Sequence, residues 1–486
     1  MNRKAKIIAT LGPSSNTPKT IGELMDAGIN VARLNFSHGT HQSHLDLINM
    51  IRSISKTKNH AIPILQDLQG PKLRVGNLPK NGVHLIANEI IAMELDINHH
   101  ENDYEEGQHK KIFLEIPDII HCLKAGGRIL LDDGKLELEI QEIYRHGFFA
   151  KVLLGGLLTS NKGVNLPGTS LDIPGFTEKD RQDLAFGIKN GIDAVAISFV
   201  RTADDIECVK NYIKELSPHR KIPVIAKLEL PEAIRNLDII LDRADGVMVA
   251  RGDLAVETSP AEVPIIQKEI IQAANRKAKL VITATQMLDS MIDNPRPTRA
   301  EASDVANAIF DGTDVLMLSG ESASGKYPVE SVKMMVSIIE KAENNIGEWG
   351  HYYKSSIENN QDDAFAISIA ARELAQDRKV TAVAVFTQSG RSALLQSKAR
   401  PTVPIMAFTP HENTYRTLEM YWGVIPHLVK ISNSLEEMII HVEDALLSSG
   451  KFFVGEKVVL ISGFPIGEMR ATNLALLHTI GGITSS

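Results

Sequence analysis

The stretch from Pro223 to Glu257, PVIAKLELPEAIRNLDIILDRADGVMVARGDLAVE, decides the fold predicted for this chain. Two short apolar runs, PVIAK and GVMVA, are typical of buried strands. The segment between them, from Glu232 to Arg243, has helical character. The stretch is therefore predicted to form a strand–helix–strand unit with parallel strands and a right-handed crossover. Both strands then end on the same edge of the sheet.

Charged residues follow both apolar runs. Lys227 and Glu229 end the first run, and Arg251 and Asp253 follow the second. Carboxylates are hard oxygen ligands that suit Mg²⁺ or Mn²⁺, with water and substrate completing the coordination. Lys227 would then face an anion held on the metal. For one strand alone, the more ordinary explanation is a solvated charge that caps a buried strand, so the site interpretation depends on recurrence along the chain.

The same alternation recurs on both sides of this stretch. Further predicted strands lie within residues 6–12, 30–39, 61–70, 194–200, 280–286 and 314–322. Predicted helices separate them, and two begin at recognisable caps: Thr177 with Asp180, and Thr298 with Glu301. Eight strand–helix repeats predict an α/β fold of the (β/α)₈ (TIM barrel) type over residues 1–70 and 169–346. Its chemistry is expected at the carboxyl ends of the strands.

Polar residues do collect at those carboxyl ends. They are Arg33, Asn35, Ser37, His38, Asp67, Lys227, Glu229, Asp253, Thr285, Gln286, Ser319 and Glu321. Two cations beside two metal-type carboxylates suggest a substrate with both phosphate and carboxylate groups. Gly252 would let backbone N–H groups approach such a ligand, and a short helix beginning there would receive its carboxylate. No Walker-type loop, protein-kinase motif set or covalent-catalysis constellation is evident, which favours phosphoryl transfer by positioning and charge neutralisation.

Two other regions depart from the barrel pattern. Residues 71–168 show short strand-like periods joined by turns, which predicts an inserted all-β domain, a small β-barrel. A polar linker near residues 354–363 precedes a separate α/β domain over 350–486. In that domain, the loop of residues 387–392 joins a strand to a helix whose start carries hydroxyls and an arginine. Such a helix start binds phosphate, although an ordinary capped turn explains the loop nearly as well.

Composition excludes several classes of protein. A net charge of −8 and an isoelectric point near 6.1 disfavour a nucleic-acid-binding protein. Cys122 and Cys208 form no disulfide framework or metal-type spacing, which favours a reducing compartment. No apolar run approaches the ~20 residues of a membrane span, and the basic start leads into a strand rather than a signal peptide. We therefore expect a cytoplasmic protein of about three domains with no membrane partner.

Several segments resemble the motifs of the pyruvate kinase family, in that family's order and spacing. They are NVARLNFSHG, DLQGPKLR, NKGVNLPG, VARGDL, ATQMLDSM, PRPTRAEASDVANA and MLSGES. They span the barrel and the insert, whereas the C-terminal domain fits in layout with weaker motifs. The resemblance implies phosphoryl transfer from phosphoenolpyruvate to ADP, giving pyruvate and ATP in the last step of glycolysis. It also implies an insert that closes as a lid, and a homotetramer whose interfaces include the linker and the helix after Thr298.

The resemblance also implies roles for individual residues. Lys227 would stabilise the transferring phosphoryl group, Arg33 would contact the phosphate, and Glu229 and Asp253 would bind Mg²⁺ or Mn²⁺. Gly252, Asp253 and Thr285 would hold the substrate carboxylate. Thr285, Ser319 and Glu321 would lie where the enol is protonated, with the proton donor left open. The nucleotide phosphates would face Asn35, Ser37, His38, Arg74 and Lys162. A sugar-phosphate effector would bind Thr387, Ser389, Gly390, Arg391 and Ser392.

This sequence departs from the family pattern at a few positions. Potassium-dependent members carry a threonine after the aspartate of strand three and a glutamate four residues later, where this chain has Leu68 and Lys72. The family's potassium ligands Asn35, Ser37, Asp67 and the Leu68 carbonyl are nevertheless present, so a residual potassium site stays open. We hypothesise that the Lys72 ammonium replaces K⁺. Ala255 stands where the family usually has glycine, beyond the ligand-contacting pair.

Two competing functions remain at this stage. Another barrel that handles phosphoenolpyruvate or oxaloacetate, a lyase or a mutase, would explain the carboxylates and Arg33. It would not explain Lys162 or the C-terminal domain. A non-catalytic sensor of phosphorylated metabolites would be expected to have lost the site, yet Lys227, Glu229 and Asp253 are all present.

Overall fold

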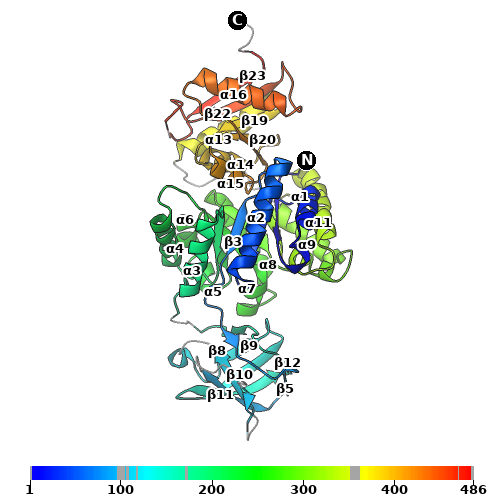
Figure 1. The fold of residues 1–486 in the computed structure, drawn as a ribbon, viewed down its shortest axis with the longest axis vertical. Helices are drawn as coiled ribbons and strands as arrows, with labels where there is room; N and C mark the ends of the chain where they lie inside the picture. The colour runs from blue at the N-terminus through cyan, green and yellow to red at the C-terminus, as the bar shows by residue number, and fades with distance from the viewer. Residues whose placement is uncertain are drawn as a thin grey trace.

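The computed structural model of the chain describes residues 3–95, 104–105, 109–115, 119–169, 173–350, 362–468 and 470–482. A barrel occupies the middle of the elongated molecule, with a β-rich insert at one end and an α/β unit at the other (Figure 1). Most of the predicted polar linker of residues 354–363 lies outside the described residues, which omit 351–361. Within the described part, no helix has the length and apolar character that a membrane crossing requires.

The central sheet is a closed parallel barrel in the strand order β1-β18-β17-β16-β15-β14-β3-β2. The strands are β1 (Lys6–Thr10), β2 (Val31–Asn35), β3 (Ile64–Asp67), β14 (Ala194–Ile197), β15 (Val224–Leu228), β16 (Gly246–Ala250), β17 (Leu280–Ala284) and β18 (Val315–Leu318). These strands are continuous apolar runs because their side chains are buried both inside the barrel and beneath the helices. The predicted (β/α)₈ fold is confirmed.

Helices surround the barrel on its outer face (Figure 1). They are α1 (Pro18–Ala27), α2 (His41–Lys58), α3 (Glu178–Lys189), α4 (Ala203–Leu216), α5 (Pro231–Arg235), α6 (Leu237–Arg243), α7 (Arg251–Glu257), α8 (Val263–Arg276), α9 (Arg299–Asp311), α10 (Gly320–Ala323), α11 (Pro328–Asn344) and α12 (Ile346–Trp349), with short 3₁₀ turns η1 (Pro13–Ser15) and η3 (Asp289–Ile292). Both predicted capping boxes are present, at Thr177 before α3 and at Thr298 before α9.

One helix prediction was wrong. The segment Glu232–Arg243 forms two short helices, α5 and α6, rather than one. They meet at Asn236, whose side-chain amide donates to the Arg201 carbonyl at 2.9 Å. That bond joins the break to the loop after β14. The interruption coincides with this tertiary contact, and no proline or glycine stands at the junction.

The insert between β3 and α3 consists of strands and one 3₁₀ turn in its described part. They are β4 (Arg74–Val75), β5 (Val83–Leu85), β6 (Ile90–Leu95), β7 (Tyr104–Glu105), β8 (Lys111–Glu115), β9 (Arg128–Leu131), β10 (Leu136–Tyr144), β11 (Gly147–Leu154), β12 (Gly156–Leu158) and β13 (Val164–Asn165), with η2 (Ile120–Cys122). The main sheet runs β13-β9-β10-β11-β6-β8-β4, and an isolated bridge from Arg74 to Gly163 brings its two ends together. The insert encloses its own apolar core. We call it the lid.

The C-terminal unit is a sheet in the order β21-β20-β19-β22-β23, in which β23 alone runs antiparallel to its neighbour. Its elements are α13 (Asp363–Asp377), β19 (Ala382–Phe386), α14 (Arg391–Ala399), β20 (Ile405–Thr409), α15 (Glu412–Leu418), β21 (Val424–Leu428), α16 (Leu435–Ser448), β22 (Lys457–Ser462) and β23 (Leu474–Thr479). The predicted α/β character of this region is confirmed.

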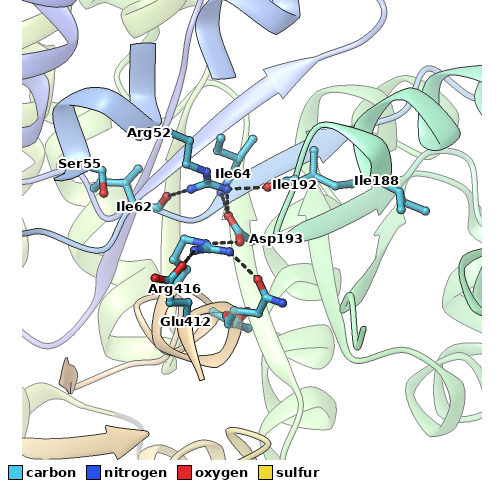
Figure 2. A network of polar contacts seen from close by, with 12 residues as sticks. Arg52, Ser55, Ile62, Ile64, Ile188, Ile192, Asp193, Glu412 and Arg416 are labelled. Atoms are coloured by element: carbon cyan, nitrogen blue, oxygen red, sulfur yellow. Dashed lines mark hydrogen bonds and ion pairs between the residues drawn. The ribbon is translucent and has the colours of Figure 1, made fainter. Parts of the chain in front are cut away.

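Buried ion pairs attach this unit to the amino end of the barrel. Asp193, just before β14, lies between Arg52 of α2 and Arg416 of α15, at 2.5 and 2.7 Å (Figure 2). It also accepts the backbone N–H of Ile64 at 2.8 Å. Asp314, just before β18, pairs with Lys398 and Arg400 in the same way. The C-terminal unit therefore contacts one end of the barrel, and the lid lies at the opposite end.

Candidate functional site

The carboxyl ends of the barrel strands, which we call the rim, carry a buried cluster around Lys227. Its ammonium group lies 2.9 Å from Glu229 Oε1 and 3.3 Å from Asp67 Oδ1. Asp67 in turn accepts a hydrogen bond from Arg33 Nε at 2.7 Å. Both carboxylates are 1% exposed. Strands β2, β3 and β15 thus bring together two cations and two anions that sequence analysis had assigned to the rim.

Burial and charge act in opposite directions on these groups. Burial would raise the pKa of Asp67, but the charges of Lys227 and Arg33 outweigh it and lower that pKa. Burial would lower the pKa of Lys227, but Asp67 and Glu229 outweigh it and raise that pKa. The pKa of Glu229 is raised because burial and the nearby Asp253 carboxylate together outweigh Lys227. The raised pKa means that the surroundings of Glu229 do not fully stabilise its ionised form, which an additional positive charge would do.

Asp253 lies at the start of α7, as predicted, and its side chain has no hydrogen bond or ion pair with any described residue. Two neighbouring carboxylates, one lacking a partner and the other with a raised pKa, form a donor set that suits a divalent cation. Within the described residues, no group of three or more His, Cys, Asp or Glu side chains could hold a metal by itself. Glu229 and Asp253 therefore fit a metal that substrate and water help to coordinate.

The ends of β16 and β17 are joined by hydrogen bonds. The Gly252 N–H donates to Thr285 Oγ1 at 2.8 Å, and Arg251 donates to the Thr285 and Gln286 carbonyls at 2.7 and 3.1 Å. Thr285 and Gln286 have φ values of 67° and 53°, which is rare for residues other than glycine and typical of strain at functional sites. A Cβ atom on Gly252 would meet only ordinary contacts at 3.6 Å, so no packing inside the protein requires glycine there.

The end of β18 presents Ser319 and Glu321. The two oxygens of Glu321 accept the N–H groups of Leu288 and Ser319 at 3.0 and 2.7 Å. Burial raises the pKa of Glu321, against the effect of these bonds. The Ser319 hydroxyl is buried without a hydrogen-bond partner among the described residues. A buried, unpaired hydroxyl beside a carboxyl group of raised pKa is a suitable start for a proton path.

The end of β2 brings further predicted residues into contact. Asn35 Oδ1 accepts the Ser37 N–H at 3.1 Å. His38 is exposed, and its pKa is lowered by partial desolvation and then by the charges of Arg74, Lys72 and Arg33. The base of the lid therefore adds positive charge to the rim beside His38, where an anionic ligand would be stabilised.

Two of the predicted lid residues bind partners close to their own strands. Arg74 donates to the Asn161 carbonyl at 2.9 Å, and Lys162 forms an ion pair with Asp132 at 2.8 Å. The lid is also tied to the barrel, because Asn165 donates to Glu257 of α7 at 2.7 Å. Lys162 is thus held within the lid, and no described contact connects it to the rim.

Sequence reasoning missed Ser198, Phe199 and Thr10. Ser198 follows β14 and bonds both Lys227 and the Leu68 carbonyl at 2.7 Å. The Phe199 N–H donates to Glu229 at 2.6 Å, and Thr10 accepts from Arg33 at 2.9 Å. All three stand at strand ends, so the rule that selected polar strand-end residues covers Ser198 and Thr10 but not Phe199, which acts through its backbone N–H. Ser198 had the same signal as Asp67, a polar residue after an apolar run.

The loop of residues 387–392 lies in the C-terminal unit, away from the rim. It joins β19 to α14, and Gly390 at its turn has a φ of 84°. The Gly390 N–H donates to Thr387 Oγ1 at 3.0 Å, and Ser392 accepts from Thr472 at 2.7 Å. Ser389 and Arg391 also line a cavity of about 340 Å³ there, together with residues 462–463, 466–468 and 470–472. Arg391 forms an ion pair with Asp362.

Comparisons with known proteins agree with this architecture. The pyruvate kinase barrel domain matches residues 2–332, and the pyruvate kinase alpha/beta domain matches residues 365–478. A pyruvate kinase from Geobacillus stearothermophilus is 42% identical over 99% of this chain and 81% of its own length. Those of Sporosarcina psychrophila and Staphylococcus aureus (strain MRSA252) are 41% and 40% identical over the same shares of both chains.

Proposed function

This chain belongs to the pyruvate kinase family, and we propose that it transfers the phosphoryl group of phosphoenolpyruvate to ADP, yielding pyruvate and ATP. The observation that carries the proposal is the buried Lys227, held between Asp67 and Glu229 beside Arg33. A fixed cation at a site shielded from water is what a migrating phosphoryl group requires, since its charge spreads over the equatorial oxygens.

The phosphate end of the substrate would contact Lys227 and Arg33. Glu229 and Asp253 would hold Mg²⁺ or Mn²⁺, which when bound supplies further neutralisation of the phosphoryl oxygens. Arg33 is itself fixed by Asp67 and Thr10. Because both cations are already oriented in the protein, little reorganisation would be needed during transfer.

The carboxylate end of the substrate would lie against Gly252, Asp253 and Thr285. The absence of an internal packing reason for Gly252 supports this role, since the close approach would then be that of a ligand. Loss of the phosphoryl group leaves an enol that must gain a proton. Thr285, Ser319 and Glu321 would form that proton path, because the Ser319 hydroxyl is buried and unpaired among the described residues.

The nucleotide phosphates would face Asn35, Ser37, His38, Arg74 and Lys162. The cationic surroundings that lower the pKa of His38 support this placement. Lys162 would approach the nucleotide when the lid closes over the rim, after releasing Asp132.

The enzyme would work without K⁺, with the ammonium group of Lys72 supplying the monovalent charge. Two observations support this role: Lys72 contributes to lowering the pKa of His38, and the Leu68 carbonyl already accepts the Ser198 hydroxyl.

Regulation and assembly complete the proposal. The 340 Å³ cavity beside Ser389 and Arg391 would take a sugar phosphate, and the enzyme would act as a cytoplasmic homotetramer. The two cysteines, both free, are consistent with a reducing compartment.

The test is pyruvate formation from phosphoenolpyruvate, ADP and Mg²⁺, with and without K⁺. Equal turnover in both conditions is the expected result. Turnover only with K⁺ would keep the kinase and contradict the role of Lys72. No turnover in either condition, even with sugar phosphates added, would contradict the kinase and favour a lyase or mutase.

A further inference from the structure

The end of β14 contacts both members of the Lys227–Glu229 pair. The Ser198 hydroxyl accepts from the Lys227 ammonium at 2.7 Å, and the N–H of the next residue, Phe199, donates to Glu229 Oε2 at 2.6 Å. We infer that Ser198 and Phe199 are positioning residues that fix the phosphoryl-transfer cation and the metal-binding carboxylate relative to each other. This inference rests on the proposed function, because it assigns a role within the same site.

Ser198 is suited to fix the direction of the ammonium group. It is 4% exposed, and its single proton is donated to the Leu68 carbonyl at 2.7 Å, which leaves its lone pairs for Lys227. The Lys227 ammonium thus donates a hydrogen bond to Ser198 and forms ion pairs with Asp67 and Glu229. Ser198 is the neutral one, so it orients Lys227 without adding negative charge where a phosphate would approach.

Phe199 holds its hydrogen bond to Glu229 in a backbone conformation that is unfavourable for its residue type. Its φ is 55°, in the left-handed region that bulky residues rarely adopt. That conformation accompanies the hydrogen bond from its N–H to Glu229. Non-glycine residues in such conformations persist only where the surroundings over-determine them.

Gly70, at the start of the lid, packs closely against this pair. A Cβ atom on Gly70 would lie 3.0 Å from Ser198 Cβ and 3.1 Å from Phe199 Cδ2. Gly70 has a φ of 69°, and its N–H donates to Asp180 at 3.1 Å. Ser198 and Phe199, directly after β14, are thus held between the Lys227–Glu229 pair and Gly70, where the chain leaves the barrel for the lid.

The alternative is ordinary packing at a strand end, and kinetics distinguish the two. We propose to compare Ser198→Ala with Ser198→Thr, which keeps a hydroxyl. The matched control is Ser331→Ala in α11, where a fully buried hydroxyl donates to the Tyr327 carbonyl at 2.8 Å. Positioning predicts that Ser198→Ala lowers kcat about tenfold to a hundredfold, with KM for phosphoenolpyruvate changed less than about threefold. Ser198→Thr should recover most of kcat.

Mn²⁺ binding, followed by electron paramagnetic resonance without substrate, supplies a readout independent of turnover. Ser198→Ala should leave this affinity within about twofold of wild type, since Glu229 keeps its bond from Phe199. A Ser198→Ala enzyme with wild-type kcat would overturn the inference, and so would an equal loss of kcat in Ser331→Ala. A wild-type enzyme that forms no pyruvate would instead contradict the proposed function.

Discussion

The two ends of the same barrel both bury charged residues but satisfy them differently. At the amino end, Asp193, Asp245 and Asp314 each precede a strand and accept a backbone N–H from the neighbouring strand at 2.8 to 3.0 Å. Each also binds at least one cation at 2.5 to 2.9 Å. At the carboxyl end, Asp253 has no partner among the described residues, and the pKa of Glu229 is raised.

The difference separates charges that are satisfied within the protein from those that a ligand could complete. A carboxylate that caps a strand and neutralises a cation has its bonding complete within the protein. The rim leaves carboxylates and a hydroxyl with bonding capacity that a ligand can complete. Residue type alone does not reveal this distinction, since aspartates stand at both ends of the strands.

The largest effect is expected when the carboxylate at the carboxyl end of β15, Glu229, is compared with the one that caps its amino end, Asp245. Glu229→Gln removes the charge after β15 and should lower kcat/KM at least about a hundredfold and weaken Mn²⁺ binding. Asp245→Asn is the control, because Asp245 caps Val224 at the start of the same strand. It should leave Mn²⁺ binding unchanged. Equal Mn²⁺ affinity in Glu229→Gln and wild type would contradict the metal role.

A charge at the amino end should affect stability instead. Asp314→Asn leaves Lys398 and Arg400 without their shared carboxylate, whose oxygens lie 2.5 and 2.7 Å from them. Removing one member of a buried ion pair costs about 3–5 kcal/mol of unfolding free energy. The midpoint of denaturant unfolding measures this loss. An unchanged unfolding midpoint together with lost turnover in Asp314→Asn would contradict the structural role of the amino-end charges.

The stability of the protein should also depend on pH through Lys398, the buried cation that Asp314 binds at the amino end of the barrel. Burial lowers the pKa of Lys398 to about 8 from an ordinary value of 10.5, although Asp314 opposes the shift. Between these values the unfolded chain binds a proton that the folded protein does not, so the unfolding free energy should increase with pH across this window. The increase should be of the order of 2–3 kcal/mol and absent in Lys398→Met. Parallel pH profiles for wild type and Lys398→Met would contradict this assignment.

The smallest expected effect concerns the monovalent cation. Lys72→Gln removes the ammonium group near His38, so turnover should fall a few-fold and become responsive to K⁺. Rates measured over a range of K⁺ concentrations at constant ionic strength test this. The wild type should show no response, and a wild-type enzyme activated by K⁺ would disprove the substitution of Lys72 for K⁺.

Local signals in the sequence predicted the features that depend on neighbouring residues. The box of Thr298 and Glu301 begins α9, and the apolar runs are the barrel strands. The break at Asn236 was missed because no proline or glycine marks it, and its one side-chain hydrogen bond among the described residues is to the Arg201 carbonyl, 35 residues away.

Long-range pairs were beyond the reach of pattern reasoning. Asp193 and Arg416 are 223 residues apart in the sequence, and from the sequence alone each would be taken for a surface charge. Ser198 was detectable as a polar strand end, but its bond to Lys227 depends on the register of β14 against β15, in which Ile197 pairs with Ala226. Strand periodicity does not specify which neighbouring side chains meet.

The most direct test of the two-ended barrel compares one lysine from each end. Lys227→Met and Lys398→Met should be assayed for pyruvate formation at saturating phosphoenolpyruvate, ADP and Mg²⁺, with folded protein quantified by denaturant unfolding. We predict that Lys227→Met loses turnover at least about a hundredfold per folded molecule, whereas Lys398→Met keeps kcat per folded molecule. Full turnover in Lys227→Met, or lost turnover in a stably folded Lys398→Met, would contradict the account.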